Sequence, residues 1–123
     1  MNILILGAGQ VGSTTAKQLA KEEDNEITIV DTDLEKLNKL SSTTDLKVIE
    51  GNASYPNILE AAGADTAEML IAVTSSDEVN MIACQIASTL FKESRSVILI
   101  SSLLYFCSNI YIAGFKIFIK SVK

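Results

Sequence analysis

The sequence contains no histidine, and its 123 residues include two cysteines. Without histidine, the chain lacks the side chain most often used as a general base and as a metal ligand. Cys84 and Cys107 are far apart and have no metal-ligand spacing, which predicts buried thiols in a reducing cytosol. The sequence offers no Ser–His–Asp set, no Cys–His pair and no supported acid pair. It therefore favours binding over catalysis.

Basic residues are also fewer than acidic ones, 10 against 15, which gives a formal net charge of −5. This balance argues against nucleic acid as the main partner, since phosphate backbones are bound by clustered Lys and Arg. A hydrophobic content of 48% excludes a disordered chain, and the length indicates one domain. The apolar run 3–6 has no basic leader, so no signal peptide is expected.

Short apolar runs alternate with amphipathic stretches through the first 95 residues. Strict alternation of strand and helix with short connections predicts a parallel sheet covered on both faces. The predicted class is thus α/β, a Rossmann-like doubly wound parallel sheet. The predicted strands are 2–6, 27–30, 46–49 and 69–73, and helices are predicted to start after Gly9, near residue 33, at residue 56 and after residue 75.

Local signals mark several helix ends. Thr32 and Ser75 are each followed three residues later by glutamate, the spacing of a capping box. Pro56 suits the first turn of a helix, and Gly63 suits a left-handed C-terminus. The helical period places apolar residues on faces expected to pack against the sheet, and Met69 and Met81 are expected in the core. These face residues are Val11, Thr15, Ala16, Leu19, Ala20, Leu34, Leu37, Leu40, Val79, Ile82, Ala83, Ile86, Ala87 and Leu90.

The last 28 residues differ in composition, because all 15 acidic residues lie within 1–95. The stretch Val97–Phe115 is uncharged, and its length suits a transmembrane segment. Serine, asparagine and glycine interrupt it, however, so two strands at Val97–Ile100 and Phe115–Ile119 are favoured. We expect a Rossmann-type nucleotide-binding domain over 1–95, with 96–123 as a divergent apolar tail that supplies the last strands of the same domain.

A glycine motif, Gly-x-Gly-x-x-Gly, stands between the first predicted strand and helix. Gly7 permits the tight turn, Gly9 lets a pyrophosphate approach the backbone, and Gly12 lets the helix pack closely on the strand. The helix N-terminus then offers N–H groups to phosphate. The alternative is a glycine-rich turn that only packs. The predicted phosphate-loop residues are Gly7, Ala8, Gly9, Gln10, Val11 and Gly12.

Asp31 lies 19 residues beyond Gly12, at the end of the second predicted strand. A carboxylate there accepts hydrogen bonds from ribose hydroxyls and repels a 2′-phosphate, which favours NAD or an adenine nucleotide over NADP. Its alternative role is to cap the next helix. Asp33 is interpreted as a first-turn helix acid.

Two further loops follow predicted strands. Asn52 and Ala53 lie where an adenine would sit, and the amide of Asn52 either reads the adenine edge or forms a plain Asx turn. Thr74 and Ser75 lie beside a new helix N-terminus and are expected to face the second half of the dinucleotide. Helix capping is the alternative for Ser75.

Together these motifs resemble the N-terminal domain of the TrkA family, called RCK-N or KTN. The resemblance covers roughly residues 1–95 and is most specific at 72–81. It is carried by ILILGAGQVG at 3–12, VDTD at 30–33, GNAS at 51–54, LEAAG at 59–63 and AVTSSDEVNM at 72–81.

The resemblance implies a cytoplasmic, non-enzymatic regulatory protein at the inner face of the cell membrane. It implies NAD(H), and also ATP or ADP, as ligands, and dimers that assemble into a ring beneath a membrane-embedded potassium transporter subunit. Carried over, residues 7–11 contact the phosphates, Asp31 the ribose, and Thr74 and Ser75 the distal half. The chain departs from the family at its fifth strand, where Leu99 and Ser101 replace two arginines that usually reach the ligand.

Two other functions compete with this interpretation. One is the cofactor domain of an NAD-dependent oxidoreductase, which needs a substrate pocket and usually a positioned acid or base. The other is a small membrane-attached protein that uses Val97–Phe115. The sequence shows no such acid or base, and the polar residues that interrupt Val97–Phe115 argue against the membrane-attached protein.

Overall fold

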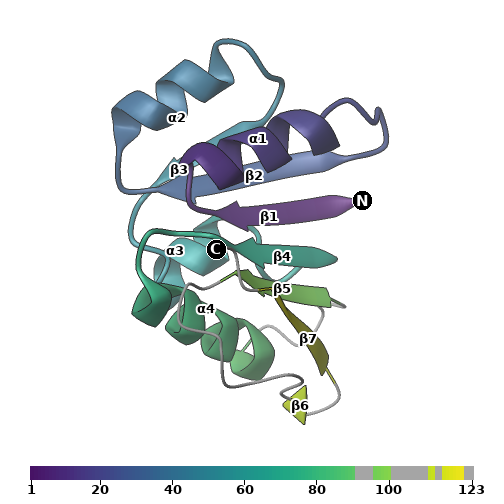
Figure 1. Ribbon diagram of the computed structural model, residues 1–123, viewed down its shortest axis with the longest axis vertical. Coiled ribbons are helices and arrows are strands. Elements are labelled where there is room, and N and C mark those ends of the chain that lie inside the picture. Colours follow the sequence, from purple (N-terminus) through teal and green to yellow (C-terminus); the bar gives the residue numbers. More distant parts are fainter. Residues whose placement is uncertain (91–95, 101–110, 113–114, 121–123) are drawn as a thin grey trace.

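The alternating strands and helices assemble into one sheet in the computed structural model, which describes residues 1–90, 96–100, 111–112 and 115–120 (Figure 1). The strand order is β3-β2-β1-β4-β5-β7-β6. All neighbours pair in parallel except β6 with β7, which are antiparallel. The strands are β1 (Asn2–Leu6), β2 (Glu26–Asp31), β3 (Lys47–Glu50), β4 (Met69–Ala72), β5 (Ser96–Ile100), β6 (Tyr111–Ile112) and β7 (Phe115–Lys120).

Four helices connect the first five strands of the sheet. They are α1 (Gln10–Leu19), α2 (Leu34–Ser41), α3 (Pro56–Ala61) and α4 (Asp77–Leu90). Each lies between two parallel strands, as the crossover connection of a parallel sheet requires. The first four predicted strands match β1 to β4 within one residue at each end.

Two hydrophobic cores lie on opposite faces of the sheet, because successive side chains of a strand point to opposite faces. Ile3 and Ile5 pack with residues of α1 and α2. Leu4 and Leu6 pack with residues of α3 and α4. The predicted doubly wound Rossmann-like architecture, with helices on both faces, is confirmed.

The helix ends agree with the sequence signals in part. Pro56 occupies the first turn of α3, and Gly63 adopts φ +82° beyond its C-terminus, as predicted. The predicted caps Thr32 and Ser75 are wrong by one residue. Asp33 caps α2, accepting from the N–H groups of Glu35 and Lys36, and the hydroxyl of Ser76 accepts from the third residue of α4.

The buried face of α4 is rotated relative to the prediction. Met81 and Ile82 are exposed, whereas Asn80 and Cys84 are buried. Small residues explain the difference, since Ala83 and Ala87 are fully buried and let the helix approach the sheet closely. The larger side chains are displaced to the outside.

Two other expected face residues, Val11 and Leu34, are also exposed. Both belong to the first turn of a helix. The remainder of the α2 face is as predicted, because Leu37 and Leu40 are buried.

The C-terminal segment contributes strands to the sheet. The predictions at Val97–Ile100 and Phe115–Ile119 are confirmed by β5 and β7. In the part of the chain that the structure describes, no helix has the length and apolar character needed to cross a membrane.

The difference in burial predicts that truncating a side chain on β4 and one on α4 lowers the stability by unequal amounts. Leu70→Ala should lower the free energy of unfolding by about 2–5 kcal/mol, because Leu70 is fully buried. Ile82→Ala, the matched control on the exposed face of α4, should cost less than about 1 kcal/mol. Urea denaturation of both variants measures the difference, and equal losses would contradict the orientation of α4.

Candidate functional site

A crevice opens where the chain reverses its winding direction along the sheet. β1 pairs with β2 on one side and with β4 on the other, and the helices that follow β1 and β4 cover opposite faces. Ligands of open α/β sheets bind at such a switch point, beyond the carboxyl ends of the strands. A cavity of about 390 Å³ lies there, lined by Gly7, Gly9, Val30, Asp31, Thr32, Asp33, Lys36, Gly51, Asn52, Ala53, Val73, Thr74, Ser75, Ser76 and Val79.

Two glycines of the motif are required by the fold itself. Gly7 has φ +109°, and an added Cβ would lie 2.8 Å from the carbonyl oxygen of Val73. A Cβ on Gly12 would lie 1.8 Å from the carbonyl oxygen of Gly7. Both positions bring backbone segments so close together that no side chain fits.

Gly9 differs, because an added Cβ there would meet no atom of the chain within 4 Å. Its backbone is extended, with φ −69°, so the conformation does not require glycine either. Gly9 is the N-cap of α1, makes no side-chain cap and lines the cavity. The first N–H groups of α1 have no intrahelical acceptor, so a bare helix N-terminus adjoins open space.

Asp31 is held at the end of β2 by two backbone donors. One carboxylate oxygen accepts from the N–H of Ala8 at 2.7 Å, and the other accepts from the N–H of Asp33 at 2.8 Å. Asp31 does not cap α2, because Asp33 does so. Each carboxylate oxygen can accept more than one hydrogen bond, so Asp31 keeps acceptor capacity toward the cavity.

The loop after β3 contributes an Asx turn. The side-chain oxygen of Asn52 accepts from the N–H of Ser54 at 2.9 Å and from its hydroxyl at 2.7 Å. The turn that sequence analysis offered as one alternative is therefore present. Asn52 also lines the cavity, as does the buried residue Ala53.

The loop after β4 forms the opposite wall of the cavity. Thr74, Ser75 and Ser76 all line it. The hydroxyl of Thr74 donates to the side-chain oxygen of Asn80 at 2.6 Å. The same hydroxyl accepts from the N–H of Ser76 at 3.3 Å. The Thr74 hydroxyl is thus engaged within the loop, whereas Ser75 is exposed.

The cavity brings together seven of the eleven residues predicted from the sequence. Those seven are Gly7, Gly9, Asp31, Asn52, Ala53, Thr74 and Ser75, whereas Ala8, Gln10, Val11 and Gly12 do not line it. Ala8 meets Asp31 through its N–H, and Gly12 is buried against Gly7.

Several lining residues were not predicted from the sequence, of which Thr32, Asp33, Lys36 and Ser76 have polar side chains. Among the described lining residues, Lys36 supplies the one positive side chain, beside Asp31 and Asp33. Its signal in the sequence was its place three residues after Asp33, in the first turn of α2. On β5, Leu99 pairs with Ala72, and Ser101 lies outside the described residues.

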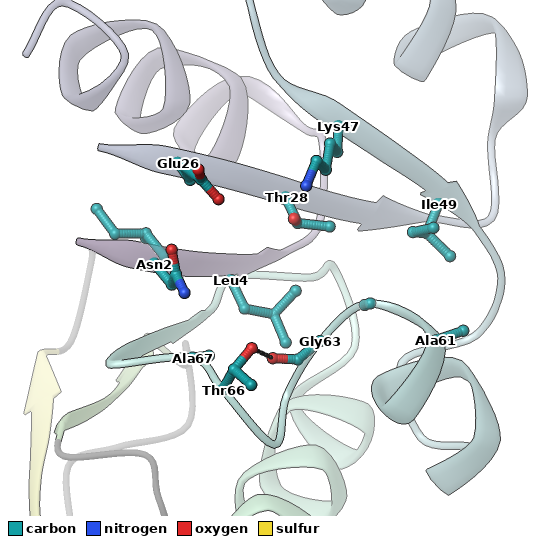
Figure 2. Close-up of a pocket in the computed structure, with 12 residues that line it drawn as sticks. Asn2, Leu4, Glu26, Thr28, Lys47, Ile49, Ala61, Gly63, Thr66 and Ala67 are labelled. Atoms are coloured by element: carbon teal, nitrogen blue, oxygen red, sulfur yellow. Dashed lines mark hydrogen bonds between the residues drawn. The ribbon is translucent and has the colours of Figure 1, made fainter. Parts of the chain in front are cut away.

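A second, smaller cavity of about 180 Å³ lies at the amino edge of the sheet (Figure 2). Figure 2 shows Leu4 between the strands and the turn in which the Thr66 hydroxyl donates to the carbonyl of Gly63. Residues 61–63, which end α3, border this cavity. Carbonyl groups at a helix C-terminus repel anions, so a phosphate ligand favours the carboxyl edge.

Groups suited to catalysis or metal binding are few in the described chain. Within those residues, no three carboxylates or thiols gather to hold a metal ion. Cys84 is buried, as predicted, and burial raises the pKa of its thiol to about 12. The thiol therefore stays protonated and unreactive near neutral pH. Cys107 lies outside the described residues.

Comparison with known proteins identifies relatives over most of the chain. A family model described as the TrkA-N domain matches residues 3–120. The Trk system potassium uptake protein TrkA of Halomonas elongata is 55% identical over 97 residues, which are 79% of this chain and 21% of that protein. The chain therefore spans about a fifth of the length of that curated relative.

Solved structures share the fold at low identity. The GsuK channel bound to NAD has a TM-score of 0.69 and 18% identity, covering 84% of this chain and 18% of that one. The Shewanella denitrificans Kef CTD in its AMP-bound form has a TM-score of 0.69 and 21% identity, covering 83% and 60%. Apo saccharopine dehydrogenase from Saccharomyces cerevisiae has a TM-score of 0.65 and 21% identity, covering 79% and 21%.

The glycine geometry predicts that two alanine substitutions lower the stability by very different amounts. Gly12→Ala should lower the free energy of unfolding by about 3 kcal/mol or more, because its Cβ would overlap the Gly7 carbonyl. Gly9→Ala should cost less than about 1 kcal/mol, because its Cβ meets open space. Urea denaturation measures both, and a large loss for Gly9→Ala would mean that this glycine serves packing.

Proposed function

The chain belongs to the TrkA-N domain family, and from that premise we propose that it binds NAD(H) in the crevice as the ligand-sensing domain of a potassium uptake system. The observation that carries the proposal is Gly9. It combines an unhindered Cβ position with a place on the cavity wall at the N-terminus of α1. The space that a side chain would fill there suits a pyrophosphate, whose charge is stabilised by backbone N–H groups and the helix dipole.

The residues of the glycine motif have different roles in the proposed phosphate site. Gly7 and Gly12 shape the turn, and the backbone of residues 9–11 faces the phosphates from the start of α1. Gln10 and Val11 act through their N–H groups, which explains why their side chains can point away from the cavity. The N–H of Ala8 is already bonded to Asp31 and serves to align the carboxylate.

Asp31 is the proposed ribose-binding residue. The two backbone hydrogen bonds fix its carboxylate beside the glycine turn, and its remaining lone pairs can accept from the 2′- and 3′-hydroxyls. A 2′-phosphate would meet Asp31 and Asp33 together, and both line the cavity. Lys36 offsets one of these two negative charges, and the charge that remains still favours NAD(H) over NADPH.

The remaining walls hold the two ends of the ligand. Asn52 and Ala53, at the end of β3, lie on the side where the adenine is expected. Because the oxygen of Asn52 is bonded to Ser54, its amide nitrogen is the group that remains to read the base. Ser75, on the opposite wall, is exposed toward the distal half, and Thr74 shapes that wall beside the glycine turn.

The names of the relatives support the choice of ligand and partner. The related structures are bound to NAD in the GsuK channel and to AMP in the Kef domain, which supports NAD(H) and extends the proposal to ATP or ADP. Relatives named for Trk potassium uptake support a membrane-embedded potassium transporter subunit as partner. We place the domain at the cytoplasmic face of the membrane, in a dimer or larger ring.

Such a sensor works without catalysis. The nucleotide shifts the assembly between two conformations only by the difference in its affinity for them. The alternative is the cofactor domain of an oxidoreductase, which the fold of saccharopine dehydrogenase favours. Hydride transfer usually needs a positioned acid or base beside the cofactor. The charged groups among the described lining residues, Asp31, Asp33 and Lys36, lie at the end of β2 and the start of α2, on the proposed ribose side. Turnover of a hydroxy or amino acid with NAD would favour the alternative.

The first prediction of this proposal concerns the ligands themselves. Calorimetric titration with NADH, NAD, ATP, ADP and NADPH should give micromolar binding of NADH or an adenine nucleotide and much weaker binding of NADPH, because two carboxylates oppose a 2′-phosphate. Gly9→Val is the site control, since it should fold and fail to bind. Absence of binding by every nucleotide would contradict the proposal.

A second prediction tests Asp31. Asp31→Ala should weaken NADH binding by more than about tenfold, because the hydrogen bonds to the ribose hydroxyls are lost. Glu35→Gln is the matched control, because it removes a charge from the exposed surface of α2 at a residue that does not line the cavity. Unchanged affinity of Asp31→Ala in calorimetry would exclude Asp31 as the ribose-binding residue.

A further inference from the structure

A fully buried polar side chain, Asn80, lies behind one wall of the crevice. Asn80 projects from the inner face of α4 and has no exposed surface. It lies one turn before Cys84 and Ala83, within an otherwise apolar core. Burying an amide there is favourable only if it is hydrogen-bonded.

Asn80 holds one residue of the wall at three atoms. Its side-chain oxygen accepts from the N–H of Thr74 at 2.9 Å and from the hydroxyl of Thr74 at 2.6 Å. Its amide nitrogen donates to the carbonyl of Thr74 at 3.1 Å. Thr74 lies beyond the end of β4, so the amide replaces the ladder partner that a strand neighbour would supply.

Thr74 in turn adjoins the glycine turn. A Cβ on Gly7 would lie 2.9 Å from both the nitrogen and the Cα of Thr74. The two backbones are thus in contact, and the position of Thr74 sets the separation between the glycine turn and the Thr74–Ser76 wall. Asn80 does not line the cavity, so it acts on the crevice through Thr74.

We propose that Asn80 is a positioning residue that fixes the Thr74–Ser76 wall and thereby provides affinity for the distal half of a dinucleotide. This inference rests on the proposed nucleotide-binding function. The adenosine half is held by other elements, because Asp31 is fixed by Ala8 and Asp33. Loss of Asn80 should therefore weaken the binding of a complete dinucleotide more than the binding of its adenosine half alone.

The test compares NADH with AMP in calorimetric titrations of the wild-type chain, Asn80→Ala and Cys84→Ala. Asn80→Ala should weaken NADH binding by about tenfold or more and AMP binding by less than about threefold, because Thr74 of the distal wall loses three hydrogen bonds. Cys84→Ala is the matched control, since it truncates a buried side chain of the same helix without touching Thr74 and should leave both affinities unchanged.

The outcomes separate the inference from the function on which it rests. Equal losses for NADH and AMP in Asn80→Ala would assign Asn80 a purely structural role, and unchanged affinities would also overturn the inference. If the wild-type chain binds neither ligand, the proposed function itself fails. If Asn80→Ala does not fold, Asn80→Ser keeps a neutral polar group that is too short to replace the amide at Thr74, and the same selective loss of NADH affinity is expected.

Discussion

The close contact between the start of α1 and the end of β1 is the constraint on which the rest of the crevice depends. Gly12 lies so near the carbonyl of Gly7 that even one methyl group would overlap it. This contact aims the N-terminus of α1 at the carboxyl edge of the sheet, where the winding reverses between β1 and β4. Without it, the helix dipole and the free N–H groups would not meet the cavity.

Two polar side chains extend this arrangement to the walls on either side. Asp31 bonds the N–H of Ala8 from the β2 side, and Asn80 bonds Thr74 from the α4 side. Each replaces a backbone partner that the sheet cannot supply at the end of a strand. The crevice is therefore shaped before any ligand arrives, which lowers the ordering cost of binding.

Much of the fold could be predicted from the sequence because apolar period and strand–helix alternation are local properties. The first four strands, the strands near residues 97 and 115, Pro56 and Gly63 were all placed correctly. The errors have one kind of cause. Asp33 and Ser76, rather than Thr32 and Ser75, cap their helices. Met81 and Ile82 are exposed because small residues of α4 pack against the sheet. Such shifts depend on how a helix docks, which a period of 3.6 residues leaves open.

The glycine turn, the acid at the end of the second strand and the order of strands and helices follow from the sequence alone, because spacing along the chain specifies them. The packed structure shows in addition which glycine leaves open space, that Ala8 aligns Asp31, and that Lys36 lines the cavity. It alone revealed Asn80 behind Thr74. These are relations between residues from different elements, and the physical reason is that close packing, rather than local propensity, fixes the distances between elements.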